Sequence, residues 1–315
     1  MDLNFFLGKL GEKSNMFGTF GDLDRKAAEN FGCFLVELVE ILGDTDGADF
    51  IRIAASREIC RHLTSKSKLV HTVQQNEWNE IDERIKTDLK TRLIQQLKVA
   101  DKFSVIQTLA DSITAVYLMG GLQGDIFGAI IGIVEETNTL YPLTASYKVL
   151  GNLVPNLHDV SIILDLVLNE TLGGVLLKGL EVTPNLCEKD ELDGLRQNTL
   201  IAFAKLISKL DVSPESNQVI QFLDMVVIKY IKSGTLVSPE ESMCIEALDL
   251  LLEILVKYKK CTDLGDKIKI QWLDFLMKNG LLKQLQVISY KERGMERAAE
   301  IVKNFYETLG EIQNL

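Results

Sequence analysis

Residues 199–210, which read Thr-Leu-Ile-Ala-Phe-Ala-Lys-Leu-Ile-Ser-Lys-Leu, decide the fold. Their large apolar side chains recur every three or four residues, a spacing that places them on one face of an α-helix. The stretch 244–258 repeats this pattern 45 residues later, so that Ala202 aligns with Ala247 and Leu206 with Leu251. A recurring amphipathic helix predicts a protein built from repeated helical units.

Helices in which a small residue precedes a large apolar one recur along the whole chain. Their spacing of 35 to 57 residues brackets the ~40–47 residues of a HEAT or armadillo unit, whose helix pairs bury their apolar faces by stacking. We therefore predict an all-α fold, an α-α superhelix of the HEAT/armadillo type with about six or seven helical pairs. We expect residues 1–315 to form a single continuous solenoid. The small residues that mark the helices are Ala54, Ala110, Ala145, Ala202, Ala247 and Ala298.

The composition favours a helical protein and disfavours several classes of function. Only 5 of the 315 residues are proline, which suits a chain of helices because a proline inside a helix costs ~3 kcal/mol. The net charge of −11 argues against direct nucleic-acid binding, which requires a basic surface. The 5 cysteines are odd in number and widely spread, which predicts reduced thiols in the cytosol or nucleus and no structural metal site.

Residues 115–134 are apolar enough to be mistaken for a membrane span. Asp125 lies near the centre of this stretch, where a charge would be costly in a bilayer. Gly120 and Gly121 interrupt it, which favours two helices joined at this point and no membrane insertion.

The sequence lacks the motifs of the common catalytic and cofactor-binding sites. It has no G-x-x-x-x-G-K-[ST] phosphate loop, no G-x-S-x-G elbow, no H-E-x-x-H helix and no EF-hand loop. Adjacent carboxylates such as Glu135-Glu136 and Glu240-Glu241 are typical of solvated helix ends. We therefore expect no enzymatic activity and no cofactor, although an enzyme built on a helical solenoid is a third, weaker hypothesis.

The first hundred residues carry a more specific pattern. Phe34-Leu35-Val36-Glu37-Leu38 is followed by Arg52-Ile53-Ala54-Ala55, then by Leu63-Thr64-Ser65-Lys66, and Trp78-Asn79-Glu80-Ile81-Asp82 precedes a basic helix. In this order the segments resemble the N-terminal region of importin-β (karyopherin-β) nuclear transport receptors. The likeness is most specific over residues 1–100 and weakens toward residue 290. Members of that family are longer, so the chain resembles their N-terminal arch alone.

The resemblance implies that the small GTPase Ran, in its GTP form, binds a charged concave face of the arch. Charge complementarity of this kind raises association rates and selects partners, and GTP orders the switch loops that such a face would recognise. Taken alone, Trp78 favours a packing role over a contact with Ran, and the lysines are also compatible with a solvated stripe. Cys60, with Arg61 beside it, stands where the family often has a basic residue. The matching positions are Lys66, Trp78, Asp82, Lys86 and Lys90.

The resemblance also implies that Phe-Gly repeats of nucleoporins bind in a groove between outer helices. A buried Phe ring contributes ~1.5–3 kcal/mol before ordering costs, so retention would rely on many weak contacts. The alternative is that the candidate walls are solenoid core, and Gly173-Gly174 leaves one wall small. The candidate walls are Leu176, Leu177, Phe222 and Leu223.

Further expectations concern cargo, location and the alternative function. In the family, importin-α or basic cargo binds mainly to later repeats, which lie outside this sequence. A transport receptor is expected in the cytoplasm, in the nucleus and at the nuclear pore. The alternative is a generic HEAT-repeat scaffold or regulatory subunit that does not bind Ran, since a fold alone does not determine a function.

Overall fold

The computed structural model describes residues 3–10, 16–65, 67–120, 125–157 and 189–210, with residues 161, 165, 174, 175, 178–180, 303 and 307 as isolated positions. The chain divides into two compact units, Met1–Asn156 and Leu157–Leu315. Each unit is described by itself.

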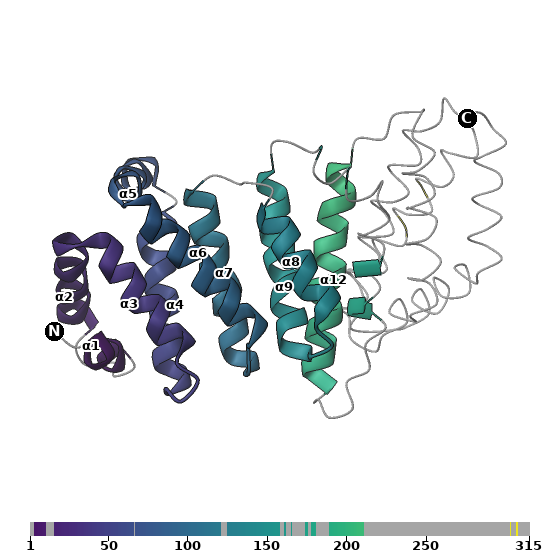
Figure 1. Ribbon diagram of the computed structural model, residues 1–315, viewed down its shortest axis with the longest axis horizontal. Coiled ribbons are helices and arrows are strands. Elements are labelled where there is room, and N and C mark those ends of the chain that lie inside the picture. Colours follow the sequence, from purple (N-terminus) through teal and green to yellow (C-terminus); the bar gives the residue numbers. More distant parts are fainter. Residues whose placement is uncertain are drawn as a thin grey trace. The chain divides into compact units, whose positions relative to one another are not determined.

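The first unit is a stack of α-helices joined by short connections (Figure 1). All the regular secondary structure in the described residues is helical, which confirms the predicted fold class. The helices are α1 (Leu3–Leu10), α2 (Met16–Glu29), α3 (Phe31–Gly43), α4 (Asp49–Leu63), α5 (Lys68–Glu80), α6 (Glu83–Lys98), α7 (Phe103–Met119), α8 (Asp125–Glu136) and α9 (Leu140–Leu153), followed by the short 3-10 helix η1 (Val154–Asn156).

Three helical hairpins, α3–α4, α6–α7 and α8–α9, form the body of this unit. Their second helices pack side by side as one row, α4–α7–α9, and their first helices form a second row, α3–α6–α8. Helix α1 packs against α4, and α5 is an additional helix between the first two hairpins. This is the arrangement expected of stacked helix pairs.

Small buried residues hold the α4–α7–α9 row together. Ala55, Ala110 and Ala145 are at most 1% exposed, and they allow neighbouring helices to approach closely. The Ser56 hydroxyl lies 2.6 Å from the Thr108 carbonyl oxygen and 2.7 Å from the Ser112 hydroxyl. The markers Ala110 and Ala145 are buried in this row. On α4 the marker Ala54 is half-buried, and the adjacent Ala55 is the alanine buried in the row.

A buried arginine links consecutive hairpins. Arg52, on α4, is 4% exposed. Its Nε donates to the Leu42 carbonyl oxygen at 3.0 Å, and its guanidinium pairs with Asp101 at 3.1 Å. Buried charges are tolerated when their donors are satisfied in this way. Arg52 therefore joins the end of α3 to the connection between α6 and α7 in the next hairpin.

The α3–α6–α8 row is less evenly packed. Helices α3 and α6 are tied by Gln96, whose side-chain amide donates to the Val39 carbonyl oxygen at 2.6 Å, and by an ion pair of Arg92 with Glu40 at 2.8 Å. Helices α6 and α8, in contrast, scarcely touch. The gap between them is where the candidate site lies.

In the second unit, α12 (Lys189–Lys209) contains the stretch that predicted the fold, except for Leu210, which directly follows the helix. All five of its expected core residues are at most 2% exposed, and Ala202 is fully buried, so the amphipathic helix is confirmed. Its sequence repeat at 244–258, with the markers Ala247 and Ala298, lies outside the described residues. The five core residues are Leu200, Phe203, Leu206, Ile207 and Leu210.

The apolar stretch at 115–134 forms two separate helices, as predicted. Helix α7 ends at Met119 with Gly120 as its C-cap, and α8 begins at Asp125. Ile126, Phe127 and Ile130 are buried in the helical stack. No described helix combines the length and the apolar character that crossing a membrane requires.

Candidate functional site

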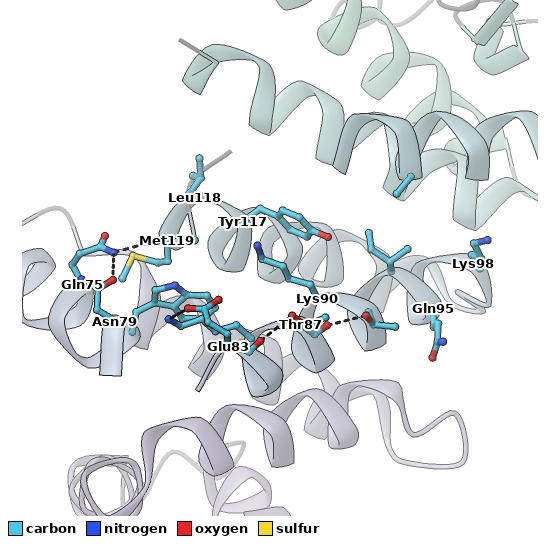
Figure 2. A pocket seen from close by; sticks show the side chains of 16 residues that line it. Gln75, Asn79, Glu83, Thr87, Lys90, Gln95, Lys98, Tyr117, Leu118 and Met119 are labelled. Atoms are coloured by element: carbon cyan, nitrogen blue, oxygen red, sulfur yellow. Dashed lines mark hydrogen bonds and ion pairs between the residues drawn. The ribbon is translucent and has the colours of Figure 1, made fainter. Parts of the chain in front are cut away.

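An open groove lies over the first unit, between α6 and α8 (Figure 2). Its volume is about 1100 Å³, and most of its lining is polar. Helix α6 supplies one wall, and α5 with the last turn of α7 closes one end. From α8, Ala129 lines the groove. The groove stays open because α6 and α8 have few contacts and because the facing residue of α8 is small. For brevity we call it the α6 groove.

Three of the five residues predicted to contact Ran line the α6 groove. Trp78 is 2% exposed, so its ring is packed in the core, and it also lines the groove. Lys86 is 8% exposed, with its ammonium 5.8 Å from the Trp78 ring centroid and 2.7 Å from the Glu83 carboxylate. Trp78 therefore has the packing role that the sequence left open, and Lys86 is largely neutralised by Glu83.

Lys90 is the more available charge of the two predicted lysines. Its Nζ lies 5.1 Å from the centroid of the Tyr117 ring, a cation–π geometry that fixes its position. A Cβ at Gly120 would lie 3.2 Å from this Nζ, so the absence of a side chain at 120 makes room for the ammonium. Within the described part of the chain Lys90 forms no ion pair.

Of the other two predicted Ran residues, Asp82 does not line the groove. Asp82 is the N-cap of α6, and its carboxylate accepts a hydrogen bond from the Arg84 backbone N–H at 2.7 Å. The exposed Asp82 carboxylate is therefore occupied in stabilising the start of α6. Lys66 lies outside the described residues.

The structure adds residues that the sequence resemblance did not single out. Lys98 continues the four-residue step of Lys86, Lys90 and Ile94, so helical periodicity alone could have found it. Its ammonium lies 3.5 Å from the Glu136 carboxylate, and both side chains are more than half exposed. Tyr117 comes from a different helix, and no local sequence signal connects it to α6.

Polar groups for hydrogen bonding follow the same wall. Thr87 and Thr91 donate their hydroxyl hydrogens to the Glu83 and Thr87 carbonyl oxygens at 2.8 Å, which leaves the hydroxyl lone pairs as acceptors. At the closed end, the Gln75 amide donates to the Met119 carbonyl oxygen at 3.2 Å and joins α5 to α7. The groove thus combines cations, hydrogen-bond acceptors and two aromatic rings, groups that can bind a polar partner.

A second charged cluster lies on α4, away from the α6 groove. The Arg61 guanidinium pairs with Glu58 and with Asp24 of α2, both at 2.7 Å, and lies over the Phe20 ring. Burial, followed by the Arg61 charge, lowers the pKa of His62 to about 4, and burial raises the pKa of Glu58. Arg61, the neighbour of Cys60, is therefore committed to holding α2 against α4 and does not face the groove.

Nucleophilic or metal chemistry finds little support in the described residues. Burial, with the nearby Asp111 charge, raises the pKa of the Cys60 thiol to about 11, so the thiol stays protonated at neutral pH. Among the side chains that the structure describes, no group of three or more His, Cys, Asp or Glu residues is placed to hold a metal ion.

The candidate walls of the Phe-Gly site, Leu176, Leu177, Phe222 and Leu223, lie outside the described residues. Gly174 is described, and a Cβ there would meet no neighbouring atom, so this position does leave open space. The Phe-Gly site stays a prediction.

Stacked helix pairs of this kind define the fold class of the chain as a HEAT-repeat solenoid. The fold is importin-β-like: a crystal structure of importin beta, determined in an ammonium sulfate condition, matches 99% of this chain with a TM-score of 0.67 at 15% sequence identity. A structure of Kap95p, described as inducing the switch loops of RanGDP to adopt the GTP-bound conformation, matches 99% of it with a TM-score of 0.67 at 16% identity.

These two matches show the fold at a level of identity that sequence comparison alone detects poorly. The chain spans 34% of the length of each of the two matching structures. No protein-family model matches the chain. The resemblance predicted from the first hundred residues is thus confirmed as an importin-β-like HEAT-repeat fold.

Proposed function

We propose that this chain is the N-terminal arch of a nuclear transport receptor and that it binds Ran in the GTP form through the α6 groove. One observation carries the proposal: Trp78, Lys86 and Lys90, selected by sequence resemblance, line a single open groove of an importin-β-like fold. The structural neighbour Kap95p acts on the switch loops of Ran, according to its description. The chain acts by binding, without catalysis of its own.

The polar character of the groove supports a protein surface as its partner. Lys90 offers a positive charge fixed by Tyr117, and Glu83 and Lys86 offer a neighbouring pair that can exchange partners. Switch loops ordered by GTP present a fixed set of charges, whereas mobile loops do not. Complementarity at this groove would therefore favour the GTP form.

The test is a pull-down of Ran loaded with GTP or with GDP. We expect GTP-selective binding that falls by at least about tenfold in the Lys86→Glu/Lys90→Glu variant, because each reversal replaces an attraction by a repulsion. Arg84→Glu is the matched control, since Arg84 is an exposed residue of α6 that does not line the groove. Equal binding to the two nucleotide states, or none, would remove Ran from the proposal.

We propose in addition that the second unit binds Phe-Gly repeats through Leu176, Leu177, Phe222 and Leu223. Retention on an immobilised Phe-Gly peptide column is expected to fall in Phe222→Ala, and unchanged retention would exclude Phe222. The receptor would shuttle between cytoplasm and nucleus, at the nuclear pore. Importin-α or basic cargo would bind to repeats beyond this sequence.

A generic HEAT scaffold is the second candidate function, and one observation favours it. Lys86 is nearly buried and already paired with Glu83, which leaves its charge less available to Ran. A scaffold would show no preference between the nucleotide forms of Ran, so the same pull-down separates the two functions.

A further inference from the structure

The α6 groove is a local positive site on an acidic protein. Three lysines line it against one glutamate, whereas the whole chain carries a net charge of −11. Lys86 and Glu83 pair with each other at 2.7 Å, which leaves Lys90 and Lys98 as the charges open to a ligand. The ion pair of Lys98 with Glu136 is long and solvated, so its exchange for another carboxylate costs little.

The spacing of these two lysines matches an extended peptide. Lys90 and Lys98 lie eight residues apart on α6, which is about 12 Å along the helix axis. In an extended chain, side chains at positions i and i+4 point to the same side about 13 Å apart. Two carboxylates with three residues between them can therefore reach both ammonium groups at once.

The middle of the groove suits an apolar side chain and a peptide backbone. Ile94 lies halfway between Lys90 and Lys98 on the same face of α6, and Ala129 of α8 lines the same groove. The Thr87 and Thr91 hydroxyls keep acceptor lone pairs after their bonds to α6 carbonyls, so they can accept from backbone N–H groups. Position i+2 of the peptide would place its side chain near Ile94.

We propose that the α6 groove binds an extended acidic segment of a partner protein with the pattern acid-x-apolar-x-acid. The two acids pair with Lys90 and Lys98, and the apolar side chain packs on Ile94. Lys90 is shared with the proposed Ran contact, but this inference holds for any partner with such a segment and does not require Ran.

The test uses fluorescence anisotropy with an end-blocked, fluorescein-labelled peptide containing Glu-Ser-Leu-Ser-Glu and the full chain. We expect saturable binding that weakens with added NaCl, as solvated charge contacts do. Replacing both glutamates of the peptide by glutamine is expected to weaken binding about tenfold, and Lys90→Glu/Lys98→Glu to weaken it at least as much. Arg84→Glu should leave it unchanged.

Three results would overturn the inference: equal binding of the glutamine peptide, wild-type affinity in the double reversal, or equally tight binding of a single-stranded oligonucleotide. The peptide exchange leaves the protein untouched, so the test does not depend on the variant folding. The Ran pull-down separates the two proposals. Peptide binding without Ran binding would contradict the Ran proposal alone. GTP-selective Ran binding without peptide binding would contradict this inference alone.

Discussion

The two rows of helices in the first unit differ in how they are packed. In the α4–α7–α9 row, alanines and serines let the helices approach closely, and the Ser56–Ser112 contact is buried between α4 and α7. In the α3–α6–α8 row, α6 and α8 scarcely touch, and lysines and threonines line the gap. The comparison indicates that the α4–α7–α9 row, here called the closed row, supplies stability, whereas the α3–α6–α8 row, here called the open row, carries the α6 groove.

Arg52→Ala is expected to give the largest effect, because it breaks the buried link between hairpins. It leaves the Leu42 carbonyl without its side-chain donor and Asp101 without its cation. Removing one partner of a buried pair costs about 3–5 kcal/mol, and partial exposure of Asp101 places the loss in the free energy of unfolding near 3 kcal/mol. Urea denaturation measures it.

The control for that variant lies in the open row. Arg92→Ala removes solvated ion pairs with Glu40 and Asp88 and is expected to cost less than about 1 kcal/mol. Equal losses in the two arginine variants would contradict the division between the rows.

A larger side chain should also destabilise the closed row more than the open row. Ser112→Leu inserts bulk where α4 and α7 are in contact, and it is expected to lower the free energy of unfolding by about 2 kcal/mol. Thr91→Leu adds comparable bulk on the exposed wall of the α6 groove and should change stability by less than about 0.5 kcal/mol. Thermal unfolding of the pair gives the comparison, and a stable Ser112→Leu protein would show that the closed row has spare volume.

The His62 cluster predicts a pH dependence at the α2 end of the closed row. Since the folded pKa of His62 is lowered to about 4, the unfolded chain binds the proton first, and stability falls as the pH drops from about 6.5 toward 4. The loss from pH 7.5 to pH 5 is about 1–2 kcal/mol. The raised pKa of Glu58 acts in the opposite sense, because the folded state takes up that proton more readily.

The measurement is urea denaturation of the wild-type protein and His62→Gln at both pH values. We expect the variant to lose less stability between pH 7.5 and pH 5 than the wild type, whatever its absolute stability. Asp24, Arg61 and Glu58 remain in the variant, so their contributions largely cancel in the comparison. Parallel slopes for the two proteins would contradict the neutral, buried assignment of His62.

The smallest effect on stability is expected from the groove lysines. Lys90→Glu and Lys98→Glu should each change the free energy of unfolding by less than about 0.5 kcal/mol, since neither is buried and neither closes a network. Thermal unfolding of the single variants checks this. A large destabilisation would mean that α6 depends on these charges for its packing.

The sequence was informative where a single helix decides the outcome. The spacing of Leu200, Phe203 and Leu206 predicted the buried face of α12, because helical periodicity is local. It did not show which of the adjacent alanines Ala54 and Ala55 is buried, because that depends on how a neighbouring helix packs against α4.

The candidate site was only partly predictable for the same reason. Lys86 and Lys90 lie four residues apart on one helix, so the sequence places them on the same face. Lys98 could have been added by extending this four-residue spacing. The pairing of Lys90 with Tyr117, and the room left at Gly120, depend on how α7 packs against α6. The N-cap role of Asp82 was not predicted, because an exposed N-cap and an exposed binding carboxylate have the same local sequence.

Site-specific crosslinking to Ran tests the central claim, that the open row is the binding surface, most directly. A photoreactive amino acid would replace either Thr91, in the α6 groove, or Arg57, an exposed residue of α4 in the closed row. The account predicts a crosslink to Ran loaded with GTP from position 91 and none from position 57. A crosslink from position 57 alone would contradict it.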